Sequence, residues 1–251
     1  MSDQPSVDLE IPPSVLAVGA HSDDVEFACG ATLAKWAAAG ASVHLLVLTD
    51  GSKGTWDPGA DLQELVAERR REQEKAAAVL GLTEVTWLGR VDGELESGLA
   101  ERARVCEVIR ATRPVVVVGH DPWARYRLHP DHRHAGLLVT DGIVAARDPH
   151  FFPDQTFPPH RPRRLLLFEA EAPDHYEGVE GWTDTKIEAL LCHRTQWRNT
   201  MGIDADGPDS DMPLAMSQRA AFARRIEEEA AAAGREAGLA RAEAFKLLED
   251  L

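Results

Sequence analysis

Short apolar, β-like runs recur along the first 170 residues, separated by longer segments in which apolar positions follow a helical period. The run Val115–Val118 cannot alternate between apolar and polar faces, which is typical of a central parallel strand covered on both faces. The predicted strands are Val15–Val18, Val43–Leu48, Val85–Leu88, Val115–Val118 and Leu165–Phe168. The predicted helices span about 26–39, 61–80, 99–112 and 130–147. Strands that alternate with helices predict right-handed crossovers and therefore a parallel α/β sheet.

The remaining segments divide the chain into three expected parts. These are a polar lead-in at 1–13, the α/β domain at 14–200, and a linker with a helical C-terminal extension at 201–251. The tail from Pro213 to Leu251 is rich in Ala, Glu and Arg and is expected to form one or two helices packed on the domain. Such a tail could also pack between subunits of a homo-oligomer. The Pro- and Phe-rich stretch 149–163 is expected to be an extended loop that, with 171–183, frames a substrate pocket.

Composition narrows the classes of function. The 251 residues, 44% of them apolar, suit one α/β domain with a small appendage. A formal net charge of −15 argues against binding to nucleic acid or an anionic membrane surface. No apolar run approaches the roughly 20 residues of a membrane helix, and the first residues do not resemble a leader peptide. We therefore expect a cytoplasmic protein that acts on a small molecule.

Polar clusters follow two of the predicted strands. The first strand ends in the segment Ala20-His21-Ser22-Asp23-Asp24-Val25-Glu26, which leads into a helix. About a hundred residues later, His129-Pro130-Asp131-His132 also follows an apolar strand. Proline suits the first position of a helix and aspartate its first turn, so both histidines would lie at a helix N-terminus. Ligands bind at the carboxyl ends of strands in open α/β sheets, so the two clusters would face one site.

Histidines and carboxylates in this combination suit one divalent metal. Zinc hydrolases usually hold the ion with three protein ligands and leave one position open for water. Two histidines and one carboxylate also suit Fe²⁺, so the donors alone leave the metal open. One aspartate of the Asp23-Asp24 pair could bind the ion while the other acts as general base. The alternative, in which Ser22 and Asp23 only cap a helix, does not account for the second cluster.

The two motifs resemble those of the PIG-L/LmbE-like N-deacetylases. Residues 20–26 are similar to the family's AHPDDxE signature, with Ser22 in place of the usual proline, and 129–132 match its HPDH motif. The similarity covers about 15–200. It includes Thr49-Asp50-Gly51, Arg69-x-x-Glu72, Asp92-Gly93, Lys186 and His193-x-Thr195-Gln196.

The resemblance implies a Rossmann-like fold, an open and mostly parallel sheet with helices on both faces. It also implies a zinc-dependent hydrolase that removes an acetyl group from the amide nitrogen of an N-acetylglucosamine-type substrate. By motif position, the implied metal ligands are His21, Asp24 and His132. The implied catalytic groups are Asp23 as general base and His129, backed by Asp131, for the tetrahedral intermediate or the leaving amine. The implied substrate-binding residues are Arg69 and Asp92.

Several residues near the motifs keep two interpretations. Some family members have a tyrosine two residues before the first histidine of HPDH, where this chain has Arg127 and, one residue earlier, Tyr126. A catalytic part for either is left open. His120, at the end of the fourth strand, either supports a metal histidine or begins a loop. Cys29 either lines the site or packs in the core.

Two other functions stay open at this point. A ferrous oxygenase would use His21, Asp23 and a distal histidine, although such sites usually lie in all-β barrels. A non-catalytic binding module would use the metal structurally, although structural zinc sites are usually closed and rich in cysteine. A dinucleotide site is disfavoured because the first turn lacks GxGxxG. Nothing in the sequence selects one substrate.

Overall fold

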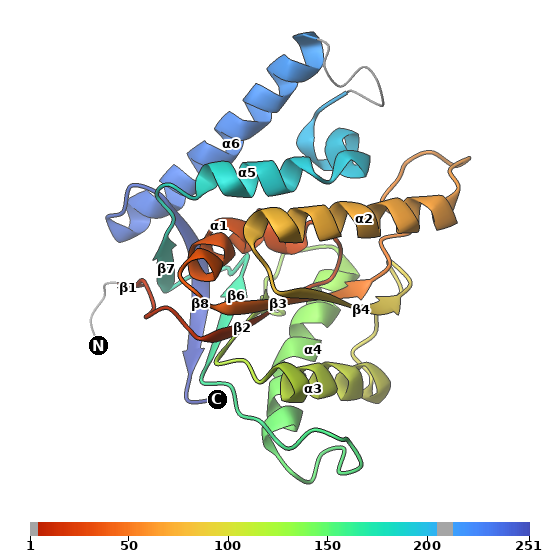
Figure 1. Cartoon of the computed structure of the whole chain (residues 1–251), viewed down its shortest axis with the longest axis vertical. Coiled ribbons are helices and arrows are strands. Elements are labelled where there is room, and N and C mark those ends of the chain that lie inside the picture. The colour runs from red at the N-terminus through yellow and green to blue at the C-terminus, as the bar shows by residue number, and fades with distance from the viewer. Residues whose placement is uncertain (1–4, 205–212) are drawn as a thin grey trace.

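One mixed sheet organises the chain. The computed structural model describes residues 5–204 and 213–251, and in these residues eight strands pair in the order β1-β7-β8-β6-β5-β2-β3-β4 (Figure 1). The strands are β1 Ser6–Val7, β2 Ser14–Gly19, β3 Ser42–Thr49, β4 Glu84–Arg90, β5 Val116–His120, β6 Arg164–Phe168, β7 His175–Gly178 and β8 Ala242–Glu249. The helices are α1 Asp24–Ala38, α2 Leu62–Leu80, α3 Leu99–Thr112, α4 Pro130–Arg147, α5 Thr183–Leu191 and α6 Pro213–Ala237. A 3-10 turn at Arg194–Gln196 and a π-helical turn at Trp197–Met201 follow α5.

The central part of the sheet is parallel and doubly wound. Strand β2 pairs in parallel with β3 on one side and with β5 on the other, so that Val15 lies opposite both Val43 and Val116. The chain runs from β2 outward through β3 to β4, then returns to β5 and continues outward to β6. The strand order therefore reverses between β2 and β5, which is where open α/β sheets form their ligand crevice. The predicted Rossmann-like sheet with helices on both faces is confirmed.

Helices cover both faces, which explains the uninterrupted apolar runs. Val15 and Ala17 of β2 pack with Trp36 of α1, whereas the alternate residues Leu16 and Val18 lie in the core formed with α3 and α4. Helices α1 and α2 lie on one face and α3 and α4 on the other, and α5 and α6 lie outside α1 and α2 (Figure 1). The carboxyl ends of β2 and β5 stay free of these layers and can carry polar residues.

The end of the chain departs from the prediction of helices alone. Helix α6 forms as expected, but residues 242–249 form β8, which lies antiparallel between β6 and β7. The Ala, Glu, Lys and Leu residues of β8 have high helix propensity, but propensity is a weak determinant and pairing on both sides of the strand overrides it. The lead-in also contributes β1, which pairs with β7. The linker predicted after residue 201 lies, from 205 to 212, outside the described residues.

The loop 149–163 lies away from the pocket that it was expected to frame. It leaves the C-terminal end of α4 and leads to the start of β6, which is the amino edge of the parallel strands. The buried Arg110 of α3 secures it by donating hydrogen bonds to the carbonyls of Asp148, Phe151 and Phe152. The prediction that this loop borders the site is wrong, because it connects elements at the opposite edge of the sheet.

Among the described residues, no helix combines the length and the apolar character needed to cross a membrane.

Candidate metal and active site

The first motif forms a tight turn between β2 and α1. Asp23 has φ 85° and ψ −23°, a left-handed conformation that is uncommon for a residue other than glycine, and α1 begins at Asp24. The backbone N–H of His21 donates to Asp24 Oδ2 at 2.7 Å and closes the turn. Asp23 occupies the N-cap position without a side-chain capping bond, and the buried Ser22 hydroxyl has no partner within the described chain. The capping interpretation is therefore not supported.

The second motif begins α4. His129 is the N-cap and Pro130 the first helical residue, as predicted, and His129 Nδ1 accepts the N–H of Asp131 at 3.3 Å. The fully buried Asp131 carboxylate accepts from the backbone N–H groups of Gly93, at 2.6 Å, and Leu95. It also lies 3.1 Å from His21 Nε2. Asp131 therefore supports His129 through its backbone, while its side chain ties α4 and the loop after β4 to His21.

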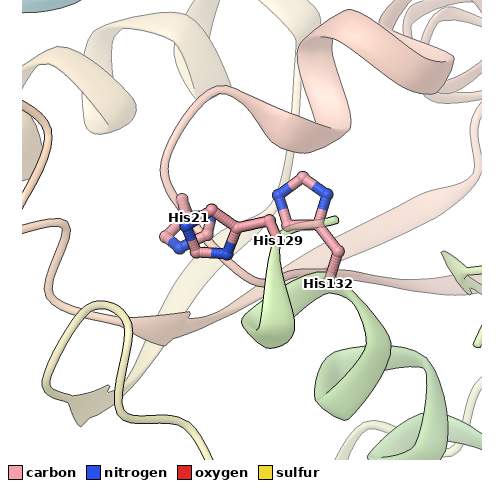
Figure 2. Close-up of side chains that lie close together, drawn as sticks. All are labelled: His21, His129 and His132. Carbon is pink, nitrogen blue, oxygen red and sulfur yellow. The ribbon is translucent and has the colours of Figure 1, made fainter. Parts of the chain in front are cut away.

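The two motifs meet at the edge of the sheet. Figure 2 shows the rings of His21, His129 and His132 grouped between the turn before α1 and the first turn of α4, with centroids 4.7–5.3 Å apart. The Asp24 carboxylate lies 3.4 Å from His21 Nδ1 and 3.3 Å from His132 Nε2. Asp24 thus lies close to both of the other predicted metal ligands, His21 and His132.

The structure adds further donors to this cluster. His120, at the end of β5, places Nε2 3.2 Å from Asp24 Oδ2. The combinations whose ligand atoms all lie within 4.8 Å of one another are His21 with His129 and His132, Asp24 with His120 and His132, and His21 with Asp92, His129 and Asp131. Nitrogen and oxygen donors that are mostly buried and converge from four elements fit a divalent metal such as zinc. No cysteine takes part, so the donors also fit Fe²⁺.

The charges of the cluster are strongly coupled. Burial alone would raise the pKa of Asp24, but His132 and His21 hold it well below its usual value. Burial works to lower the pKa of His132, but the Asp24 carboxylate outweighs it and raises that pKa to about 9. A bound cation would replace the protons on the histidines that bind it, because metal ligands must be deprotonated.

The neighbouring Asp23 has the opposite electrostatic character. Burial raises its pKa to about 7 and the Asp24 charge adds to this, although the Arg69 guanidinium 3.8 Å away opposes the shift. Two adjacent carboxylates whose pKa values are pushed apart suit different roles. Asp24 is poised to stay ionised within the cluster, and Asp23 to exchange a proton near neutral pH.

Arg69 and Asp92, predicted to bind substrate, both line the pocket and both hold neighbouring loops. The buried Arg69 of α2 donates from Nη1 to Gly51 O at 3.0 Å and from Nη2 to Ser22 O at 2.9 Å. Asp92 accepts the N–H of Lys53 at 3.0 Å and lies 3.1 Å from His21 Nε2. Burial would raise the pKa of Asp92, but hydrogen bonding to His21 lowers it.

A cavity of about 640 Å³ opens beside the cluster. Its wall includes Phe27, Lys53 and Asn199, and the strongly exposed Trp56 stands at its edge. Arg127 lines it, whereas Tyr126, one of the two residues left open by the sequence, does not. Residues 149–163 and 171–183 take no part in its wall. The volume suits a small molecule.

The sequence did not identify Glu169 as a site residue. It directly follows β6, accepts from Arg127 Nη2 at 2.6 Å and lies 3.3 Å from His120 Nδ1. Burial works to raise the pKa of Glu169, but hydrogen bonds with His120 and His132 hold it at about 2. The signal that could have revealed it is its position, since an acidic residue right after an apolar parallel strand lies at the ligand edge. Cys29, by contrast, packs in the core between the sheet and α1.

Comparison with known proteins agrees with this geometry. A family model described as PIG-L, GlcNAc-PI de-N-acetylase, matches residues 16–143, which include both motifs. The chain belongs to the PIG-L family.

Relatives of this PIG-L member are deacetylases. It is 32% identical to diacetylchitobiose deacetylase of Thermococcus kodakarensis over 73% of this chain and 70% of that protein. It is 35% identical to 1D-myo-inositol 2-acetamido-2-deoxy-alpha-D-glucopyranoside deacetylase of Kineococcus radiotolerans over 80% of this chain and 73% of that protein. The chain spans about half the length of several other curated deacetylases that it matches.

A solved structure supports the same assignment. N,N'-diacetylchitobiose deacetylase from Pyrococcus horikoshii superposes with a TM-score of 0.81 and 27% identity, covering 95% of this chain and 84% of that one. The relatives are enzymes that act on N-acetyl amide bonds, so N-deacetylation fits this PIG-L member. The oxygenase and the non-catalytic module are not favoured.

Proposed function

We propose that this PIG-L member is a zinc-dependent hydrolase that removes the acetyl group from an N-acetylglucosamine-type small molecule. The observation that carries the proposal is the meeting of both motifs at one edge of the sheet, where Asp24 lies 3.4 Å from His21 Nδ1 and 3.3 Å from His132 Nε2 and Asp23 lines the adjoining pocket. The names of the relatives support a substrate with an acetylated amino sugar. A cytoplasmic location and a homo-oligomeric assembly stay predictions.

His21, Asp24 and His132 would hold the zinc ion, with His120 beside Asp24 as a further nearby imidazole. A bound zinc ion would polarise the amide carbonyl and lower the pKa of a bound water toward about 7. Of these residues, Asp24, His120 and His132 offer ligand atoms that all lie within 4.8 Å of one another, and His21 Nδ1 lies 3.4 Å from the Asp24 carboxylate.

Proton transfer would rest on Asp23 and His129. Asp23 accepts the proton of the attacking water and can return it to the leaving amine. Burial and the neighbouring His21 and His132 lower the pKa of His129, which favours its neutral form. Because His129 Nδ1 accepts a backbone N–H, its Nε2 carries the hydrogen and can donate to the developing oxyanion. Asp92 and Arg69 would border the sugar.

The test compares metal content and deacetylation in the same preparations. Wild type, Asp24→Ala and His132→Ala are analysed for bound metal by mass spectrometry and for amine release from N,N'-diacetylchitobiose and N-acetylglucosamine. We expect about one zinc per chain in wild type, loss of metal and activity in both variants, and loss of activity with a chelator that added zinc restores. Metal-free wild type without amine release would contradict the proposal. Recovery with Fe²⁺ but not zinc would correct the metal.

A further inference from the structure

The turn that carries Asp23 has a conformation that needs support. The left-handed region costs most residues other than glycine roughly 1–2 kcal/mol, and although aspartate tolerates it better than most, hydrogen bonds to the flanking peptide group fix the conformation at a buried position such as this. Rotating the peptide group between Ser22 and Asp23 would relieve the backbone and turn the Asp23 side chain away. The position of the proposed general base therefore depends on what holds this one peptide group.

Helix α2 holds both ends of that peptide group. Arg69 and Gln73 are four residues apart, and therefore on one face of the helix, and both are buried. Arg69 Nη2 donates to the carbonyl of Ser22 at 2.9 Å, and Gln73 Oε1 accepts the N–H of Asp23 at 3.2 Å. These are the oxygen and the nitrogen of the same peptide group, so a rotation breaks both bonds at once.

Glu26 determines which way the Gln73 amide faces. Gln73 Nε2 donates to Glu26 Oε1 at 2.5 Å, and the N–H of Asp23, which can only donate, requires the amide oxygen on the other side. The amide oxygen is therefore left to face Asp23. Glu26 is itself fully buried in the first turn of α1, three residues after Asp23. The contacts from Asp23 to Gln73 and from Gln73 to Glu26 therefore link two residues of the same turn through α2.

We propose that Arg69 and Gln73 are positioning residues that lock the Ser22–Asp23 peptide group, with Glu26 setting the orientation of Gln73. This rests on the proposed role of Asp23 as general base. It gives Arg69 a role besides bordering the sugar, because its guanidinium already binds two carbonyls. Neither Gln73 nor Glu26 lines the cavity beside the cluster, so the positioning role of these two residues needs no contact with substrate.

The first experiment replaces Gln73 with a residue of similar size that cannot accept a hydrogen bond. In Gln73→Met we expect kcat to fall about 10- to 100-fold, since displacing a reacting group by about 1 Å can cost that much. KM should stay within about threefold of wild type, and one metal per chain should remain. Gln63→Met is the matched control on the exposed first turn of the same helix, and it should behave as wild type.

Rescue separates positioning from a general loss of packing. Glu26→Met should lower kcat by a similar factor, and Glu26→Met with Gln73→Met should cost little more than either alone, because one chain of contacts is broken in each. The exchange Glu26→Gln with Gln73→Glu keeps a donor and an acceptor in place and should recover most of kcat.

A crystal structure of Gln73→Met gives a readout that does not depend on activity. We expect Asp23 to leave the left-handed conformation while α2 keeps its place. An unchanged φ at Asp23, a loss of metal, or a defect confined to KM would overturn the inference. If wild type itself binds no metal and releases no amine, the proposed function fails instead, and the crystal structure still tests the lock.

Discussion

Asp23 and Asp24 are adjacent in sequence, yet their side chains face different surroundings because their backbones differ. Asp23 lies in the left-handed region, whereas Asp24 is the first residue of α1. Asp24 therefore turns toward His21 and His132, and Asp23 toward Arg69 and the pocket. One change of backbone conformation separates a candidate ligand from a candidate base.

Exchanging Asp23 for asparagine should separate base from ligand. Asp23→Asn keeps the size of the side chain but cannot take a proton, so kcat should fall by about 10²–10⁴-fold, which is typical of a lost general base. The amount of bound metal should stay at the wild-type level. Kinetics and metal analysis on one preparation check this, and loss of metal in Asp23→Asn would assign that aspartate to the metal instead.

His193 should make stability depend on pH. Burial lowers its pKa to about 3, and the Arg69 charge adds to this, whereas the unfolded value is about 6.5. The unfolded chain takes up the proton first, so stability that is present above pH 6.5 is lost as the pH falls. Between pH 7 and pH 5 the wild type should lose about 2 kcal/mol more than His193→Gln. Urea unfolding at both pH values measures the difference, and equal losses would contradict the assignment.

At this scale local spacing in the sequence was enough to predict that the two motifs lie near each other. His21 and Asp24 belong to one motif that follows the end of a strand, and His132 belongs to a motif that follows another. Because parallel strands end at the same edge of the sheet, we could expect these residues to lie near one another. Gln73 and Glu169 could not be identified in the same way. Gln73 sits in a helix rich in charged residues and Glu169 stands alone after its strand, and the partners of both lie far away in the sequence on other elements.

At the scale of elements, the loop between β3 and α2 is shaped around one side chain. A Cβ added to Gly54 would overlap the guanidinium of Arg69, and Gln196 Nε2 would lie 3.0 Å from it. Gln196 in turn donates to Gly54 O at 3.0 Å. The loop can therefore approach α2 this closely only because residue 54 has no side chain.

Gly54→Ala should disturb both the loop and the site. The buried Arg69 is bonded to Gly51 and Ser22 and cannot move without breaking those bonds, so overpacking should cost about 1–3 kcal/mol of stability. Activity should fall as well, because a displaced Arg69 no longer donates its hydrogen bond to the carbonyl of Ser22. Gly59→Ala in the same loop meets only Asp57 Oδ1 at 3.4 Å and is the control. Thermal unfolding and kcat compare the two, and equal behaviour would argue against the role of Gly54.

The sequence predicted strands β2 to β6 because each contains a short run rich in apolar and β-branched residues. Strand β8 was missed because its residues also favour a helix, and only pairing with β6 and β7 decides between the two. The loop 149–163 was misplaced for a related reason. The composition of this loop predicts an irregular structure, but it does not determine at which edge of the sheet the loop lies.

For the molecule as a whole, β8 connects the sheet to the helix that begins with Asp24. Helix α1 is interrupted at Cys29, where φ is −148°, so the residues that follow begin a second helical segment. The buried Glu243 of β8 accepts the N–H groups of Thr32, at 2.8 Å, and Ala31, and pairs with Lys186 Nζ at 2.7 Å. A carboxylate there serves the second segment as a cap.

Removing this carboxylate should weaken the whole fold. Glu243→Ala leaves the Lys186 ammonium and two N–H groups buried without their partner, so unfolding should become easier by about 2–4 kcal/mol. Glu249→Ala, at the exposed end of the same strand, removes only a surface pair with Arg164 and should cost less than about 1 kcal/mol. Urea unfolding compares them, and equal effects would show that Glu243 does not act as a cap.

The place of β8 also bears on how the protein is made. Residues 242–249 follow every other strand in the sequence, yet they lie between β6 and β7. Until β8 has been synthesised, one edge of β6 is therefore unpaired. The pair formed by β7 and β1 cannot yet join the rest of the sheet, because β8 is the strand that links β7 to β6. Such an edge can pair with other chains until it is covered. A chain whose synthesis stops before residue 242 would thus expose the edge of β6 and be prone to aggregate. In the complete chain β8 pairs with β6 and covers this edge.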